Sequence, residues 1–424
     1  MDTIFALATA VGKAGVAVLR VSGDQADAAC LALAGDLPAP RYAALRRLTD
    51  ADGQVLDEAL VLRFEAGQSF TGEPVVEFQV HGSMAVIRSI LDRLGTIDGL
   101  RHAEAGEFTR RALTNGRLDL TQVEALGDLI EAETQAQHRL AMDGFVGGLR
   151  DLADQWRDRL LQAVGLLEAS IDFADEEVPV DVTPDVRAAM ADIMTGLKDQ
   201  LTGLNAAERV RTGFEVAIVG PPNAGKSTLL NHLAGREAAI TSEFAGTTRD
   251  VIEVRMDIGG MAVTLLDTAG LRESDDPIEQ IGVGRARARA EAADLRVHLV
   301  PEGQDTILPV LDGDIVKTAK ADNGGGVSGK TGVGVSALIA EINATLSEKV
   351  SGAGLATRER HRIALSQAMH HLEQAESLLD QGPVGDDLTS EELRFAIRRL
   401  ESLVGRVDVE DVLGYIFARF CVGK

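Results

Sequence analysis

The sequence of 424 residues is poor in cysteine and in aromatic side chains. Two cysteines, Cys30 and Cys421, are too few for a disulfide framework, so we expect reduced thiols and a cytoplasmic protein. Aromatic residues make up 4% of the chain, so its cores must consist mainly of leucine, valine, isoleucine and alanine. We find no basic region before the first apolar stretch and no apolar run long enough to span a bilayer. These absences argue against a secreted, disulfide-stabilised protein and predict no membrane segment.

Basic residues are too few to balance the acidic ones. The chain has 42 lysines and arginines against 66 aspartates and glutamates, a formal net charge of -24. This balance argues against a protein that coats nucleic acid by bulk charge, because such binding neutralises phosphates with basic side chains. One basic stretch, residues 108–117 with Arg110, Arg111 and Arg117, leaves two interpretations open. It is either a local RNA-binding patch or the solvated beginning of a helix.

A chain of this length predicts about two to four domains. Residues 1–117 mix strand-like runs with helical spacing and predict an α+β domain. Residues 118–210 and 351–424 are mainly helical in pattern, whereas residues 211–350 alternate apolar strands with glycine-rich turns and helices. We therefore predict a multidomain α/β and α protein, in which a three-layer α/β domain is inserted into a helical bundle. Two unrelated helical domains on either side of the α/β domain are the alternative.

Helix signals refine this outline. Thr183 is expected as the N-cap of one helix, with Pro184 at its first helical position. Thr389 and Glu392 have the spacing of a capping box at the start of another helix. A helical pattern over residues 121–142 places four apolar residues on one face, namely Val123, Leu126, Leu129 and Ile130.

The strongest motif is a phosphate-binding loop. A strand at residues 215–219 runs into the pattern GPPNAGKS, residues 220–227, and a helical pattern follows. In this strand–loop–helix context the backbone amides of the loop curl round a phosphate. Lys226 then reaches the β- and γ-phosphates, and the hydroxyl of Ser227 is a ligand for Mg²⁺.

Two further motifs follow in the order typical of GTPases. Thr248, in "AGTTRD", is a candidate second Mg²⁺ ligand, and Asp267, at the end of a buried strand, is expected to hold Mg²⁺ through water. The amide of Gly270, in "DTAG", is placed to meet the γ-phosphate. Leu271 follows, where Ras-type enzymes have a water-orienting glutamine, so another residue must orient the water. The nearby carboxylates, most of them equally explained as a solvated loop, are Glu273, Asp275, Asp276 and Glu279.

The base-reading motif departs from its usual form. Lys320 and Asp322 have the spacing of the "NKxD" motif, in which the aspartate accepts from N1 and N2 of guanine. Ala319 occupies the position of the amide side chain, and Thr318 lies one residue too early to replace it. We still expect GTP rather than ATP, because "DTAG" and "AGTTRD" are typical of GTPases. The segment that resembles the loop covering the base comprises Ser328, Gly329 and Lys330.

Together these motifs resemble the tRNA-modification GTPases of the MnmE/TrmE type. The resemblance rests on "GPPNAGKSTLLN", "AGTTRD" and "DTAGLRES…IEQIG" in the central part of the chain. It extends to "VAVLRVSG", "VVEFQVHG" and "AGEFTRRALTNGRLDLTQVEAL" before that part, and to "EDVLGYIFARFCVGK" after it. Ribosome-assembly GTPases share only the central domain. The resemblance implies a folate-binding N-terminal domain, a helical domain and a Ras-like GTPase domain inserted in it.

The same resemblance implies a function. Such enzymes are homodimers that form a heterotetramer with a partner dependent on FAD and NADH. Together they build an aminomethyl or carboxymethylaminomethyl group on carbon 5 of the wobble uridine of certain tRNAs. The one-carbon donor is 5-formyltetrahydrofolate or a related tetrahydrofolate, and K⁺ stimulates the GTPase when two GTPase domains pair. The alternatives left open are an RNA-binding regulatory GTPase of ribosome assembly and a folate-dependent aminomethyltransferase that GTP merely gates.

Carried over by position, the resemblance implies site residues. Glu279 would orient the attacking water, and Cys421 is a candidate for chemistry on the one-carbon unit or a buried packing residue. Folate would contact Arg20, Glu77, Arg117 and Lys424, although the family usually has lysine at position 117. K⁺ would be held by Asn223, Ser242, Thr247 and the carbonyl of Phe244. The nucleotide and its ions would meet Asn223, Ala224, Gly225, Lys226, Ser227, Thr228, Ser242, Glu243, Phe244, Ala245, Gly246, Thr247, Thr248, Asp267, Thr268, Ala269, Gly270, Lys320, Asp322, Ser328, Gly329 and Lys330.

Overall fold

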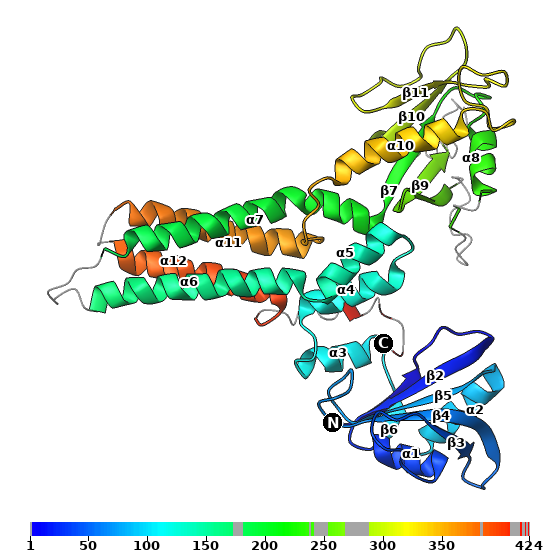
Figure 1. The fold of residues 1–424 in the computed structure, drawn as a ribbon, viewed down its shortest axis with the longest axis vertical. Helices are drawn as coiled ribbons and strands as arrows, with labels where there is room; N and C mark the ends of the chain where they lie inside the picture. Colours follow the sequence, from blue (N-terminus) through cyan, green and yellow to red (C-terminus); the bar gives the residue numbers. More distant parts are fainter. Residues whose placement is uncertain are drawn as a thin grey trace, which may run out of the picture. The chain divides into compact units, whose positions relative to one another are not determined.

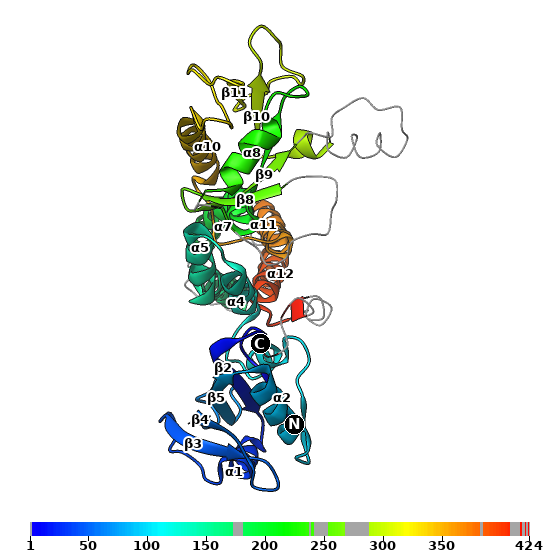
Figure 2. The same ribbon diagram turned by 90° about the vertical axis from the view of Figure 1, so that its right-hand side faces the viewer.

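The structure is a computed structural model of the chain (Figures 1 and 2). It divides into two compact units, one formed by residues 1–127 with 401–424 and the other by residues 128–400. The residues that it describes are 2–172, 181–236, 239–240, 253–267, 288–381, 385–407, 416–417, 420 and 423.

The first unit is built on a six-stranded sheet in the order β3-β4-β5-β2-β1-β6. The pair β1–β6 is parallel, and the other neighbours are antiparallel. The strands are β1 (Thr3–Leu7), β2 (Ala14–Ser22), β3 (Ala44–Thr49), β4 (Val55–Phe64), β5 (Val75–Gly82) and β6 (Leu100–His102). The helices that accompany them are α1 (Ala26–Ala34), α2 (Met84–Gly95) and α3 (Glu107–Thr114), and α4 (Leu120–Glu131) follows.

Both faces of strand β1 are buried. Successive side chains of a strand point to opposite faces, so Phe5 joins the core that α1 and α2 cover, whereas Ile4 and Ala6 join a second cluster. That second cluster contains Phe108 of α3, with Phe70 packed against it. Segment 65–74 and α3 therefore cover part of the sheet face opposite α1 and α2.

The helices of the second unit come from both sides of the α/β segment. Helix α7 packs against α6, which precedes it, and against α11, which follows the α/β segment. Arg187 of α7 forms an ion pair of 2.7 Å with Asp380 at the end of α11. Figure 1 shows α6, α7, α11 and α12 side by side, so one bundle is interrupted by the α/β segment. These helices are α5 (Gln135–Phe145), α6 (Gly148–Asp172), α7 (Thr183–Thr212), α11 (Glu359–Leu379) and α12 (Asp386–Val404).

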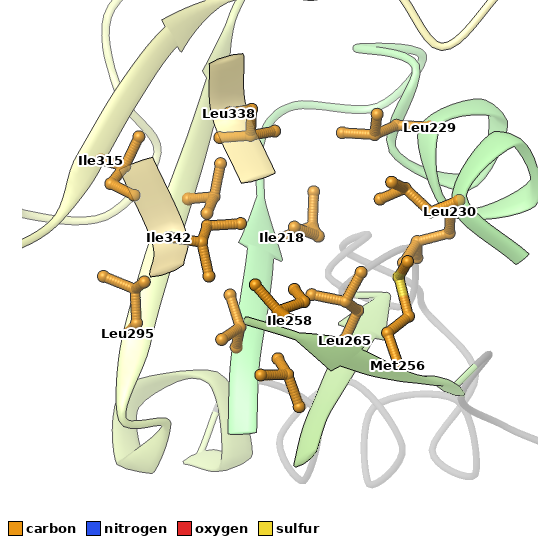
Figure 3. Packing of buried hydrophobic residues seen from close by; sticks show 14 of the residues in the cluster. Ile218, Leu229, Leu230, Met256, Ile258, Leu265, Leu295, Ile315, Leu338 and Ile342 are labelled. Carbon is orange, nitrogen blue, oxygen red and sulfur yellow. The ribbon is translucent and has the colours of Figure 1, made fainter. Parts of the chain in front are cut away.

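The α/β segment contains a five-stranded sheet in the order β11-β10-β7-β9-β8. All neighbouring strands are parallel except β8 and β9. Helices α8 and α10 cover one face, where their leucines interdigitate with the strands (Figure 3). The chain leaves β7 at the centre of this sheet, where open α/β sheets bind ligands. The elements are β7 (Phe214–Val219), α8 (Lys226–Ala234), β8 (Glu253–Ile258), β9 (Met261–Asp267), β10 (Leu295–Val300), β11 (Ile315–Thr318) and α10 (Val335–Val350).

Both predicted helix caps are wrong. Helix α7 begins at Thr183 itself, with Val182 at the N-cap position and Pro184 at the second helical position, and the carboxylate of Asp181 accepts a hydrogen bond of 3.0 Å from the Thr183 N–H. Helix α12 begins at Asp386, one turn before the predicted start. Thr389 is therefore inside the helix, where its hydroxyl donates to the Gly385 carbonyl at 2.9 Å. Glu392 pairs with His371 of α11 at 2.7 Å.

The helical pattern over residues 121–142 is divided between two helices. Helix α4 ends at Glu131, and Thr134 caps α5 in a capping box with Gln137. Val123 is fully buried, but Ile130 is 42% exposed, because the helix ends beside it. Of the four residues predicted on one face, Val123 alone is buried, Leu126 and Leu129 are half-buried and Ile130 is exposed, and the predicted segment is divided by the start of a second helix at the capping box.

The described residues bear on two sequence-based expectations about the cellular setting. Cys30 is buried on α1, and burial raises the pKa of its thiol to about 11, so this cysteine is an unreactive packing residue. No helix in the described ranges combines the length and the apolar character needed to cross a membrane.

Candidate functional site

The phosphate loop leaves β7 and enters α8 as predicted. Asn223 and Gly225 both have positive φ angles, +62° and +96°, which turn the loop sharply before the helix begins. Gly220 lies so close to the neighbouring strand that a Cβ there would be 2.5 Å from the Leu299 carbonyl oxygen. The loop therefore ends at a helix N-terminus, where free backbone amides favour an anion.

Lys226 is oriented within this loop. The side chain is only 6% exposed, and its Nζ donates to the carbonyl oxygens of Gly220 at 2.7 Å and Pro221 at 3.1 Å. These two hydrogen bonds hold the ammonium group against the backbone of the loop. The arrangement fits a loop that takes up polyphosphate.

Ser227 and Asp267 meet at the end of the loop. The Ser227 hydroxyl donates to Asp267 Oδ2 at 2.6 Å, and Asp267 is 4% exposed. The other carboxylate oxygen, Oδ1, is buried with no hydrogen-bond partner among the described residues. Hard divalent cations bind such carboxylate and hydroxyl oxygens, so the pair fits Mg²⁺.

A pocket of about 220 Å³ adjoins the loop and brings three separate motifs together. Asp322 lies in this pocket, and its carboxylate accepts a hydrogen bond of 2.5 Å from the Ser328 hydroxyl. Gly329 packs on α8 so closely that a Cβ would be 2.4 Å from the Leu229 nitrogen. The pocket is lined by Ala224, Gly225, Thr228, Leu229, Leu299, Lys320, Asp322, Val327, Ser328, Gly329 and Lys330.

Ala319 contributes no polar group to the pocket. Its backbone continues the sheet, donating to the Val300 carbonyl at 2.8 Å and bridging to Val327, and its methyl group belongs to the apolar core. Sequence reasoning missed the apolar residues that line the pocket, Leu229, Leu299 and Val327. Leu229 lies on α8 within the phosphate-loop motif, whereas no motif marks Leu299 and Val327, which the order of the strands brings to the pocket.

Two predicted folate contacts form a pair in the first unit. Arg20 of β2 lies directly opposite Glu77 of β5, and its Nε donates to Glu77 Oε1 at 2.8 Å. The guanidinium carbon lies 5.5 Å from the centre of the Phe70 ring and 5.6 Å from that of Phe108. Sequence reasoning missed both rings. Arg117 lies against Gly72, in the segment that carries Phe70, where a Cβ would be 3.2 Å from the Arg117 Cγ.

One of the three arginines in the basic stretch at residues 108–117 is buried. Arg111 is 6% exposed and pairs with Glu73 at 3.0 Å and with Glu107 at 3.1 Å. Arg110 pairs with Glu104 at 3.1 Å. The RNA-binding interpretation of this stretch is therefore wrong for Arg111, because its charge is used inside the fold.

The end of the chain packs onto the first unit. Phe417 is 4% exposed, and a Cβ at Gly106, before α3, would be 2.9 Å from its ring. Gly423, with φ +105°, lies against β1, where a Cβ would be 2.0 Å from the Leu7 carbonyl oxygen. Phe417 and Gly423 therefore pack on the first unit, and only glycine fits at position 423.

Part of the predicted site lies outside the described residues. Of the predicted K⁺ ligands, the described part of the chain contains Asn223 alone. The predicted site residues outside it are Ser242, Glu243, Phe244, Ala245, Gly246, Thr247, Thr248, Thr268, Ala269, Gly270, Glu279, Cys421 and Lys424.

Comparison with known proteins finds matches to one family along the whole chain. The "MnmE helical domain" family matches residues 120–421, and "GTP-binding protein TrmE N-terminus" matches residues 3–117. The chain is 55% identical to the tRNA modification GTPase MnmE of Roseobacter denitrificans and 57% identical to that of Cereibacter sphaeroides strain ATCC 17029, in both cases over all of each chain. With a phosphate loop set between two halves of one helical bundle and this identity over its full length, the chain belongs to the tRNA modification GTPase MnmE family.

Proposed function

We propose that this chain hydrolyses GTP in the cytoplasm to drive modification of carbon 5 of the wobble uridine of tRNA. The observation that carries the nucleotide assignment is the pocket in which Asp322 and Ser328 lie beside the phosphate loop. The tRNA assignment rests on the names of relatives that match the chain from end to end.

Asp322 is the group that we expect to read guanine. Its carboxylate only accepts hydrogen bonds when ionised, and guanine offers a matching pair of donors at N1 and N2. Adenine has no such pair on that edge. The 2.5 Å hydrogen bond from Ser328 holds the carboxylate in the pocket, so Asp322 can select GTP without the amide that Ala319 lacks.

The catalytic arrangement combines described and undescribed residues. Ser227 would hold Mg²⁺ directly and Asp267 through water, with Thr248 as a second ligand. Bound Mg²⁺ supplies positive charge to the phosphates. Because Leu271 cannot orient water, we propose that Glu279 does so. Potassium at Asn223, with Ser242, Phe244 and Thr247 as its other ligands, would supply the charge that an arginine finger supplies elsewhere.

The first unit is proposed to bind the tetrahydrofolate one-carbon donor. Arg20 and Glu77 form a defined pair there, and the chain's tail packs on the same unit, which brings Gly423 against β1. Cys421 and Lys424 are proposed to act from that tail. A homodimer, and a heterotetramer with a flavoprotein partner, complete the proposal.

Replacing Asp322 tests the nucleotide assignment. Asp322→Asn should weaken GTP binding about a hundredfold or more, because it removes two charge-assisted hydrogen bonds of about 1.5 kcal/mol or more each. The same variant should gain affinity for xanthosine triphosphate, whose C2 carbonyl accepts from the asparagine amide. Asp305→Asn, an exposed aspartate in the β10–β11 segment, is the matched control. Unchanged GTP affinity in Asp322→Asn would contradict the assignment.

A deletion strain tests the tRNA assignment. Nucleoside analysis of its tRNA should show loss of the modified wobble uridine, and the purified enzyme should turn over GTP faster in K⁺ than in Na⁺. Retention of the modified uridine would favour an RNA-binding regulatory GTPase of ribosome assembly instead. Loss of the modification with equal rates in both salts would remove potassium from the proposal while leaving the tRNA role.

A further inference from the structure

The Arg20 guanidinium contacts two aromatic rings on the face of the sheet that α3 and segment 65–74 partly cover. Its carbon lies 5.5 Å from the Phe70 ring centre and 5.6 Å from the Phe108 ring centre. Its Nε donates a hydrogen bond to Glu77, and the Arg20 side chain is 20% exposed. Among the residues that the structure describes, none accepts a hydrogen bond from its two terminal amino groups. A positioned fork of donors is therefore available to a ligand.

The two residues that flank Phe70 are held in place by hydrogen bonds of their side chains. Ser69, which is 3% exposed, donates to the Glu73 carbonyl at 2.6 Å. Thr71, which is fully buried, forms a hydrogen bond of 2.7 Å with Ser22 of β2. With an anchor immediately before and immediately after it, the ring of Phe70 has little freedom to leave the guanidinium.

Phe108 is fixed by the charges at the start of α3. The ring is fully buried, and the preceding residue, Glu107, accepts hydrogen bonds from Arg101 at 2.6 Å and from Arg111 at 3.1 Å. Arg111 also donates to Glu73, in the segment that carries Phe70. One buried network of charges therefore holds both rings that face Arg20.

We propose that Phe70 and Phe108 are positioning residues, which hold Arg20 by cation–π contact so that its terminal amino groups bind the acceptor edge of a reduced folate. The proposal rests on the folate binding proposed above, and it attributes part of the affinity for folate to the orientation of Arg20 before the ligand binds. A guanidinium on a long side chain loses conformational freedom when it binds, and two rigid rings remove that freedom beforehand. Glu77 contributes by directing the fork through its bond to Nε.

Substitution of Phe70 in the full-length chain tests this proposal. Binding of 5-formyltetrahydrofolate is measured by titration calorimetry for wild type, Phe70→Leu and Phe70→Tyr. Leucine keeps an apolar side chain but has no aromatic face, so affinity should fall about fivefold to thirtyfold, as expected from the strength of cation–π contacts. Tyrosine keeps the face and should stay within about twofold of wild type. Phe108 is a poorer test site, because it is fully buried and its replacement perturbs the core.

Phe64→Leu is the matched control, because Phe64 is a partly exposed phenylalanine of β4. It should leave folate binding unchanged, and GTP affinity should be unchanged in all variants. Equal losses in the leucine and tyrosine variants, or no loss in either, would overturn the positioning role while folate binding by wild type stands. Failure of wild type to bind the folate would instead overturn the folate assignment itself.

Discussion

Replacing Glu107 with glutamine should loosen α3 and the segment around Phe70. The Glu107 carboxylate is 2% exposed and accepts from Arg101, from Arg111 and from the Glu104 amide at 2.9 Å. Glutamine preserves the shape, but it removes the charge and turns one acceptor into a donor that faces guanidinium donors. Both rings that hold Arg20 depend on this network.

The magnitude follows from the pKa of the Glu107 carboxyl. Burial raises this pKa, but hydrogen bonds from Arg101, the Glu104 amide and Arg111 outweigh burial and lower it from 4.5 to about 2. At about 1.4 kcal/mol for each pKa unit, the folded form gains about 3 kcal/mol from the ionised group. Because the folded pKa is depressed, this stabilisation is complete above pH 4.5 and is lost as the pH falls towards 2.

Hydrogen exchange read by mass spectrometry provides the assay. In peptides that cover α3, protection at pH 7 should fall about a hundredfold in Glu107→Gln, because local opening becomes easier by about 3 kcal/mol. After correction for intrinsic exchange rates, the difference from wild type should shrink between pH 5 and pH 3. Glu58→Gln, which changes an exposed ion pair with Arg47, should leave α3 unaffected. Equal protection at pH 7, or a difference that does not depend on pH, would refute the reasoning.

Three further predictions concern the GTPase part and the free thiol. Gly329→Ala should lower GTP affinity at least about tenfold in a nucleotide titration. The new Cβ would lie 2.4 Å from the Leu229 nitrogen and displace the Asp322–Ser328 pair. An affinity equal to that of wild type would show that the loop accommodates the methyl group without moving this pair. Glu279→Ala should keep nucleotide binding and lose about a hundredfold in turnover, whereas unchanged turnover would remove Glu279 from its role. Cys30, with its pKa raised to about 11, should resist alkylation at pH 8 in the folded protein, and rapid labelling of its peptide would contradict its burial.

The phosphate loop was predictable because it is local. Its elements are consecutive, and the order of strand, glycine turn and helix is dictated by the residues themselves, so β7 and α8 lie where the pattern placed them. Asp322 and Ser328 were also identified from spacing, and the structure brings them together at 2.5 Å. Motif reasoning succeeds where a function needs particular atoms at short separations along the chain.

The helix caps failed for a physical reason. Helix α7 already includes Thr183, with Val182 at its N-cap position, so Thr183 is inside the helix and not before it. Thr389 had the right neighbours in sequence, but its helix begins a turn earlier, at Asp386. Several neighbouring residues can serve as the N-cap, so a capping pattern alone does not decide at which residue a helix begins.

By itself the sequence determined the phosphate loop with its flanking strand and helix, and it identified Asp322 as the carboxylate that we propose reads guanine, because each is encoded in neighbouring residues. Only the tertiary structure decided that Arg111 is buried in a charge network and that Leu299 and Val327 line the pocket beside the phosphate loop. It alone placed the rings of Phe70 and Phe108 against the guanidinium of Arg20. Such contacts join residues far apart along the chain, and they depend on sheet order and packing, which no local pattern records.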